Sequence, residues 1–181
     1  AIRDGDVLAG FARTGLYMPI YHDDETVDVY GEEIRLVDSL QEGDVPVLTC
    51  NSRRIAPWGE LLTTRAMKLG ATGCITDGCV RDTRVIATMG FPVFSRGRNP
   101  VDPKYRGKMM WSDVPVEFCG VTVTTGDLVV ADMDGVVFVP AALMGEVIAK
   151  SREKVEAENT MRDGLNAGLP LAELFQKHGV L

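Results

Sequence analysis

The chain has 181 residues, of which 45% are hydrophobic and 25% charged, and its formal net charge is −7. This length and composition suit one globular domain with a substantial core, and the acidic balance argues against bulk nucleic-acid binding, which needs a basic surface. No run of about 18 apolar residues occurs, so we expect no membrane span, and without a charged segment followed by an apolar one we expect no signal peptide.

The first 40 residues predict only weak strands, at 7–12, 16–21, 26–31 and 32–37. A turn is expected at Gly31, between the last two of them. The strong signals for secondary structure begin only after these segments, near residue 45.

The segment 45–97 predicts two consecutive βαβ units. Strand, helix, strand, helix and strand follow one another at 45–50, 59–69, 71–78, 82–89 and 91–97. Gly70 and Gly90 end the two helices. The apolar faces are expected to be Leu61, Leu62, Ala66 and Leu69 in the first helix, and Val85, Ile86 and Met89 in the second.

Residues 114–140 are dense in β-branched side chains and predict three or four short strands. The last two strands are expected to form a hairpin around 133–135. From residue 141 the pattern is helical to about 166, and a short helix is predicted at 171–178. The fold class is therefore a layered α/β domain with a central, partly parallel sheet.

Three charged groups follow the carboxyl ends of two of the predicted strands, where parallel sheets bind ligands. Glu60 opens one helix, and Arg81 and Asp82 open the next. Alone, each has a simpler structural explanation, because a helix dipole favours a carboxylate in the first turn and Arg81 can pair with any nearby acid. Together, two carboxylates and a guanidinium predict a small acidic metal site with an anion clamp.

The backbone beside Glu60 strengthens this prediction. A helix N-terminus binds anions, and Gly59 lets a ligand approach the amides of Leu61 and Leu62 closely. Hard oxygen ligands suit Mg²⁺ or Mn²⁺, which keep several waters and take one or two protein carboxylates. With two histidines and no CxxC spacing, we expect no zinc site, and the four cysteines fit mostly buried free thiols in a reducing cytoplasm.

A 2-oxo acid fits such a site. Its carboxylate and keto oxygen would lie on the metal, with Arg81 as a planar fork for a carboxylate. The metal would act as a Lewis acid and stabilise the enolate formed when the bond between C3 and C4 breaks. Asp77, Arg96 and Arg98 are weaker candidates for the site. We expect Asp77 to serve in a turn and the two arginines to be solvated loop charges. The alternative is that the arginines line the same crevice as the metal site.

Several segments resemble the RraA-like family. They are WGELL at 58–62, GCVRD at 78–82, GFPVFSRG at 90–97, the block at 114–140 and SREKVEAE at 151–158. The resemblance covers roughly 43–181 and implies that 1–181 forms a single RraA-like domain with a C-terminal helical tail from about 141. It further implies a β/β/α swivelling-type fold that assembles as a homotrimer or a hexamer, with sites between subunits.

The same resemblance implies an activity. The family includes class II, metal-dependent aldolases of 4-hydroxy-4-methyl-2-oxoglutarate and 4-carboxy-4-hydroxy-2-oxoadipate, several of which also decarboxylate oxaloacetate. It also includes proteins that bind and inhibit a ribonuclease, and members misnamed as demethylmenaquinone methyltransferases. We therefore expect a cytoplasmic Mg²⁺- or Mn²⁺-dependent lyase that releases pyruvate from a 2-oxo acid, without nucleic-acid or membrane partners. The alternative is a non-catalytic protein that modulates a ribonuclease.

The family's aldolases carry an acidic residue, twenty intervening residues and then Arg-Asp. Here Glu60, Arg81 and Asp82 take those places. By the resemblance, Asp82 binds the metal directly, Glu60 holds metal-bound water, Arg81 binds substrate oxygens, and the amides near Leu61 and Leu62 receive the pyruvyl carboxylate. The ribonuclease-inhibiting members tend to lack the metal aspartate, so its presence favours an enzyme.

One position departs from the aldolase pattern. Aldolases of the family commonly carry Glu or Asp three residues after the Arg-Asp aspartate, and Val85 occupies that place here. This difference bears on the substrate. The general base is expected to be water held at the metal, because no histidine lies near the motif.

Overall fold

The computed structural model describes residues 1–22 and 25–180, which divide into two compact units, Ala1–Ala141 and Ala142–Leu181. The strands of the first unit are β1 (Leu8–Pro19), β2 (Asp44–Thr49), β3 (Cys74–Val80), β4 (Val93–Arg98), β5 (Gly107–Ser112), β6 (Val116–Phe118), β7 (Val121–Val123), β8 (Leu128–Ala131) and β9 (Val136–Val139). Its helices are α1 (Gly31–Asp38), α2 (Glu60–Lys68) and α3 (Thr83–Met89), followed by a 3₁₀ turn at Ala141–Leu143.

The main sheet has the strand order β4-β3-β2-β1-β8-β9, and β5 pairs with β1 outside this path. The pairs from β1 to β4 are parallel, whereas β8, β9 and β5 are antiparallel to their neighbours. All side chains of β2 and β3 are buried, as expected for central parallel strands covered on both faces. The predicted βαβ units and the β8–β9 hairpin are confirmed.

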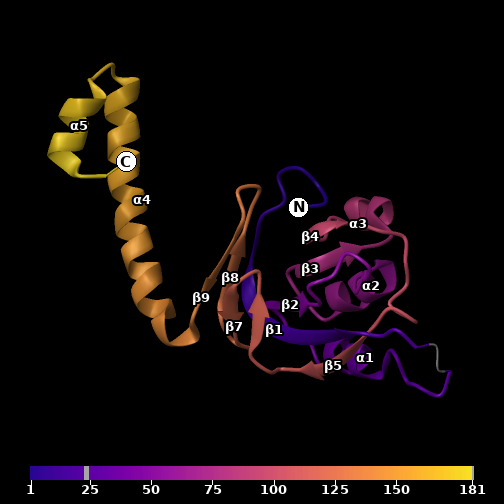
Figure 1. Ribbon diagram of the computed structural model, residues 1–181. Helices are drawn as coiled ribbons and strands as arrows, with labels where there is room; N and C mark the ends of the chain where they lie inside the picture. Colours follow the sequence, from indigo (N-terminus) through magenta and orange to yellow (C-terminus); the bar gives the residue numbers. More distant parts are fainter. Residues whose placement is uncertain (23–24, 181) are drawn as a thin grey trace. The chain divides into compact units, whose positions relative to one another are not determined.

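Two hydrophobic clusters lie on opposite faces of this sheet. The helices pack on one face, where Leu36, Ala66 and Ile86 join Leu48 and Cys74 of the strands (Figure 1). The small sheet of β6 and β7 packs on the other face, against strand residues with the opposite parity along the chain. The result is a β/β/α layering, so the predicted fold class is confirmed.

The N-terminal prediction was wrong in two places. Residues 32–37 form most of α1 instead of a strand, and 26–30 form an irregular segment with a turn that leads into it. The Asp28 carboxylate accepts hydrogen bonds from the backbone amides of Tyr30 and Gly31, and this fixes the helix start. Glu33, Leu36, Val37 and Leu40 then share the buried face at helical spacing.

β1 and β5 also differ from expectation. The two predicted strands at 7–12 and 16–21 are one 12-residue strand, which bends where its register with β5 shifts between Leu16 and Tyr17. β5 was not predicted, because GKMMWS has no β-branched residue. Its pairing with β1 determines its conformation.

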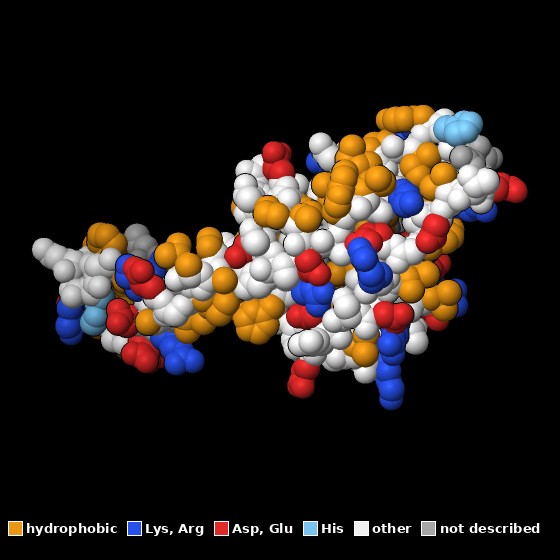
Figure 2. All heavy atoms as spheres, turned by 90° about the horizontal axis from the view of Figure 1, so that it is seen from below, with side chains coloured by type: hydrophobic (Ala, Val, Ile, Leu, Met, Phe, Trp, Pro, Cys, Tyr) orange, Lys and Arg blue, Asp and Glu red, His pale blue; other side chains and the backbone are white. Residues whose placement is uncertain are grey.

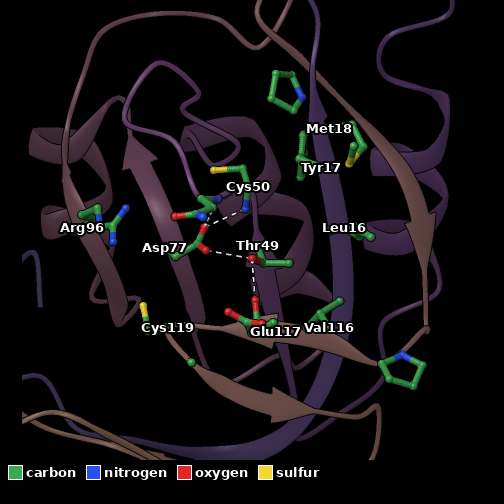
Figure 3. Close-up of a pocket in the computed structure, with 14 residues that line it drawn as sticks. Leu16, Tyr17, Met18, Thr49, Cys50, Asp77, Arg96, Val116, Glu117 and Cys119 are labelled. Carbon is green, nitrogen blue, oxygen red and sulfur yellow. Dashed lines mark hydrogen bonds between the residues drawn. The ribbon is translucent and has the colours of Figure 1, made fainter.

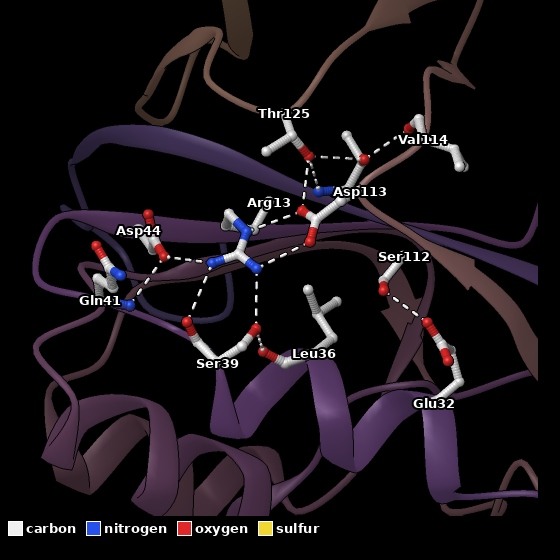
Figure 4. A network of polar contacts seen from close by, with 11 residues as sticks. Arg13, Glu32, Leu36, Ser39, Gln41, Asp44, Ser112, Asp113, Val114 and Thr125 are labelled. Atoms are coloured by element: carbon white, nitrogen blue, oxygen red, sulfur yellow. Dashed lines mark hydrogen bonds and ion pairs between the residues drawn. The ribbon is translucent and has the colours of Figure 1, made fainter.

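A polar network around Arg13 ties β1 to three other segments (Figure 4). The guanidinium donates to both carboxylate oxygens of Asp113 at 2.8 and 2.9 Å, to Asp44 at 3.0 Å, and to the carbonyl and hydroxyl oxygens of Ser39. Thr125 also donates to Asp113. The network links the end of α1, the start of β2 and the loop after β5.

The second unit consists of α4 (Met144–Asn166) and α5 (Leu171–His178), at the positions predicted. Met161 and Leu174 are buried between the two helices. Gly164 permits this contact, because a Cβ atom there would lie 2.6 Å from Leu174 Cδ2. None of the helices in the described ranges has the length and apolar character needed to cross a bilayer.

One face of the described chain shows how its charges are distributed. On the face drawn in Figure 2, acidic and basic side chains are interspersed among hydrophobic ones. This face therefore offers nucleic acid no continuous basic track.

Candidate active site

The start of α2 is fixed against the end of β3 by a buried tryptophan. Trp58 forms a parallel bridge with Val80, stacks on Phe91 with ring centroids 6.3 Å apart, and donates from Nε1 to the Thr63 hydroxyl at 2.8 Å. Its carbonyl oxygen accepts the Arg81 amide at 3.0 Å. These contacts hold the first turn of α2 beside the turn that joins β3 to α3.

The predicted charged residues meet at this point. Asp82 has a left-handed backbone with φ 57°, which aspartate tolerates better than most residues. This conformation turns its carboxylate back to α2, where Oδ2 accepts the Glu60 amide at 3.1 Å. The Arg81 Nε lies 3.9 Å from the same oxygen. The structure therefore brings the Asp82 carboxylate, the Arg81 guanidinium and the backbone amide of Glu60 together. The roles predicted for these residues remain predictions.

Gly59 is required by the close approach of these side chains. A Cβ atom at Gly59 would lie 2.8 Å from Arg81 Nε and 2.8 Å from Asp82 Oδ2. The amides of Leu61 and Leu62 follow in the first turn of α2, where the helix supplies no acceptors, so they remain available to an anion. The substrate-binding roles of Gly59, Leu61 and Leu62 remain predictions.

The orientation of two apolar side chains was predicted wrongly. Leu61 is 77% exposed and does not contribute to the apolar face of α2, which Ala66 provides with the partly buried Leu62 and Leu69. Val85 is 45% exposed, so of the three residues expected to face inward from α3, only Ile86 is fully buried. Both exposed side chains lie close in sequence to the charged cluster.

The Arg81 guanidinium also reaches residues that the sequence did not single out. Its Nη1 donates to the Ala56 carbonyl oxygen at 2.8 Å, and its Nη2 lies 3.9 Å from Asp102 Oδ2 in the β4–β5 connection. The Tyr30 hydroxyl donates to the other oxygen of Asp102 at 2.5 Å. Burial opposes ionisation of Asp102, but Tyr30, the Lys104 amide and the nearby arginines hold its pKa below the usual value.

A buried acid lies on the α1 side of this cluster. Glu33 is 3% exposed, and burial raises its pKa to about 7, against smaller lowering effects of Tyr17 and Arg81. Tyr17 is 2% exposed, and the pKa of its hydroxyl is raised well above the usual value. Burial is the larger cause, and the nearby Glu33 is the second. No local pattern could have revealed this pair, because Tyr17 lies on β1 and Glu33 on α1.

The donor set fits a hard divalent cation with few protein ligands. No group of three or more His, Cys, Asp or Glu side chains within 1–22 and 25–180 is arranged to hold a metal. Asp82 and Glu60 remain, and Mg²⁺ commonly takes only one or two carboxylates and keeps its waters. The Asp82 side chain is 46% exposed, which leaves its carboxylate accessible.

A separate pocket of about 700 Å³ lies beside the ends of β1 and β2 (Figure 3). Asp77 accepts hydrogen bonds there from the Thr49 hydroxyl and from the Cys50 and Asn51 amides, at 2.7–3.0 Å, so it fastens the end of β2. Arg96 lines this pocket together with Asp77. Arg98 donates to the Ile2 carbonyl oxygen at 3.1 Å.

Comparison with known proteins shows which family the chain resembles. The model of the RraA-like family, described as Aldolase/RraA, matches residues 3–138. An uncharacterized protein of Methanocaldococcus jannaschii is 34% identical over 122 residues, and the match spans 66% of this chain but only 57% of that protein. A Halalkalibacterium halodurans protein whose name proposes a 4-hydroxy-4-methyl-2-oxoglutarate aldolase is 30% identical over 172 residues, 87% of this chain and 80% of the relative.

A solved structure agrees in fold. Streptomyces coelicolor RraAS2, described as an unusual member of the RNase ES inhibitor RraA protein family, gives a TM-score of 0.79 at 29% identity, over 88% of this chain and 78% of that one. The family match contains every element that positions Glu60, Arg81 and Asp82. The chain belongs to the RraA-like, or Aldolase/RraA, family.

Proposed function

We propose that the protein is a divalent-metal-dependent carbon–carbon lyase that releases pyruvate from a 4-hydroxy-2-oxo diacid, or decarboxylates oxaloacetate. The observation that carries the proposal is the meeting of the Asp82 carboxylate, the Arg81 guanidinium and the first turn of α2. The aldolase name given to relatives at about a third identity supports it. A 2-oxo acid presents the carboxylate that such a clamp recognises.

Each residue has a role in this proposal. Asp82 would hold Mg²⁺ or Mn²⁺ directly, and Glu60 would hold it through water. When bound, the metal would supply Lewis-acid polarisation of the substrate's keto group. Arg81 would bind substrate oxygens through Nη2 and Nε, since Nη1 is held by Ala56. The amides of Leu61 and Leu62 would receive the pyruvyl carboxylate.

The direct test is pyruvate release, coupled to lactate dehydrogenase. The substrates are 4-hydroxy-4-methyl-2-oxoglutarate, 4-carboxy-4-hydroxy-2-oxoadipate and oxaloacetate, each with Mg²⁺, Mn²⁺ or EDTA. We expect turnover that EDTA abolishes and that either cation restores. Turnover unaffected by EDTA, or no turnover with all three compounds, would contradict the proposal.

Replacing Gly59 with alanine should lower kcat/KM by more than about tenfold, because the new methyl group displaces Arg81 and Asp82 from the first turn of α2. The matched control is Gly145→Ala in the first turn of α4, where a Cβ atom meets nothing within 4 Å. The measurement is the coupled assay together with thermal melting of both variants. Equal activity in the two variants would argue against a site at Gly59.

Val85→Glu should raise aldol cleavage relative to oxaloacetate decarboxylation, because it restores the acid that the family's aldolases commonly carry there. Val85 is 45% exposed, so the substitution should change the free energy of unfolding by less than about 0.5 kcal/mol. The ratio of the two activities in one preparation measures the effect. A ratio unchanged from wild type would remove Val85 from the explanation of specificity.

The likeness to RraAS2 supports a second candidate, a non-catalytic protein that inhibits a ribonuclease. This candidate predicts that the protein inhibits RNA cleavage, and that the inhibition persists in Asp82→Asn and in the presence of EDTA. The lyase proposal requires no binding to a ribonuclease. A homotrimer or hexamer is our prediction for either candidate, and its mass in solution tests it.

A further inference from the structure

Asp102, in the β4–β5 connection, is held by hydrogen bonds from two separate segments. Its Oδ1 accepts the Tyr30 hydroxyl at 2.5 Å and the Lys104 amide at 2.8 Å. Tyr30 lies directly before α1, 72 positions earlier in the chain, so its bond joins two distant segments. The other carboxylate oxygen, Oδ2, faces Arg81, whose Nη2 lies 3.9 Å away. Asp102 therefore links Tyr30 to the charged cluster.

Part of this arrangement has a simple structural explanation. An aspartate that accepts the amide two residues later, as Asp102 does from Lys104, is ordinary turn chemistry. This explains neither the bond from Tyr30 nor the oxygen that faces Arg81. The Asp102 side chain is 46% exposed, so an ion pair at 3.9 Å adds little stability. The contact with Arg81 is better explained by its effect on the orientation of that side chain.

The Arg81 guanidinium is contacted at each of its three nitrogens. Nη1 donates to the Ala56 carbonyl oxygen at 2.8 Å, Nη2 faces Asp102, and Nε lies 3.9 Å from Asp82 Oδ2. A guanidinium is planar and recognises a carboxylate along one edge, so the direction of its plane decides whether a ligand can be bound in a defined position. Ala56 and Asp102 together determine that direction.

We propose that Asp102, held by Tyr30, is a positioning residue that orients the Arg81 guanidinium beside Asp82. Burial, and next the bond to Asp102, raise the pKa of Tyr30 to about 12, so its hydroxyl remains the donor at neutral pH. The charge of Asp102 also offsets part of the charge of Arg81, which weakens the attraction for an anion while alignment improves. That the anion is a 2-oxo acid rests on the proposed function, whereas the orientation of Arg81 does not.

Asp102→Asn should lower kcat for pyruvate release about tenfold without raising KM, because the substrate still meets the charge of Arg81 but is poorly aligned. Asparagine keeps an oxygen that accepts Tyr30 and Lys104, so the turn persists while the charge is lost. A purely structural role predicts a lower melting temperature with unchanged kinetics of the folded protein. A wild-type kcat, or a loss confined to KM, would overturn the proposal.

Tyr30→Phe tests whether Tyr30 acts through Asp102. It should lower kcat in the same direction, and the double variant should stay within about twofold of Asp102→Asn, because the two residues act as one unit. The controls are Tyr21→Phe, in a side chain that is 80% exposed, and Asp38→Asn, which removes an acid paired with Arg65. Both controls should keep wild-type kcat and KM. Losses that multiply in the double variant would contradict a joint action.

The orientation of Arg81 is also measured without substrate, by NMR of its Nε–H group, which Arg81→Lys assigns. In the wild type the heteronuclear NOE should be that of a restrained side chain, and it should fall in Asp102→Asn and in Tyr30→Phe. An NOE equal in all three proteins would overturn the proposal. If the wild type releases no pyruvate while the NOE falls as expected, the positioning role stands and the proposed function fails.

Discussion

Asp82→Asn is expected to lower kcat/KM for pyruvate release by more than about 100-fold, because loss of a direct ligand should exceed the 10–100-fold cost of losing an outer contact. Asparagine is the informative substitution. Like aspartate it tolerates the left-handed backbone at φ 57°, and its side-chain oxygen can still accept the Glu60 amide. The variant therefore removes the charge and keeps the turn.

The measurement combines the coupled assay with thermal melting and Mn²⁺ binding by electron paramagnetic resonance. We expect wild-type melting, weakened Mn²⁺ binding and loss of turnover. The control is Asp134→Asn in the β8–β9 turn, an exposed aspartate whose amide is held by Asp132. Wild-type turnover in Asp82→Asn would contradict the assignment, because no other pair of carboxylates is proposed to hold the metal.

The sequence predicted the βαβ units because local signals agree with the final fold there. Apolar strands alternate with helices that end at Gly70 and Gly90, and the topology alone brings Glu60 to Arg81 and Asp82. The turn after β3 could be placed in the same way. In this region, short-range pattern and long-range packing favour the same structure.

The failures have the opposite cause. Residues 26–37 carry β-branched side chains that favour strands, but the Asp28 carboxylate accepts the Gly31 amide at the start of a helix whose buried face packs on the sheet. β5 depends on pairing with β1, and the exposure of Leu61 and Val85 depends on where the neighbouring layers end. Asp102 could not be predicted as part of the site, because tertiary structure alone brings it to within 3.9 Å of Arg81.

Arg13→Met is expected to lower the free energy of unfolding by about 2–3 kcal/mol. The guanidinium donates hydrogen bonds to the carboxylates of Asp44 and Asp113 and to Ser39. Methionine has no donor, so all of these acceptors lose their hydrogen bond from residue 13. The estimate lies below the 3–5 kcal/mol typical of a broken buried pair, because the Asp113 side chain is 41% exposed and solvent can replace part of the interaction. The melting temperature should fall by about 4–12 °C.

Urea unfolding of both proteins measures the change, and Arg65→Met is the control. Arg65 pairs with Asp38 at 2.7 Å, but both side chains are about half exposed, so its loss should cost less than about 1 kcal/mol. The hydrogen bond from Arg13 holds the pKa of Asp113 below its usual value. This contribution is complete above about pH 4 and is lost as the pH falls further, so the difference between wild type and Arg13→Met should shrink in acid. An equal cost for both arginines, independent of pH, would show that the network adds no more stability than a surface ion pair.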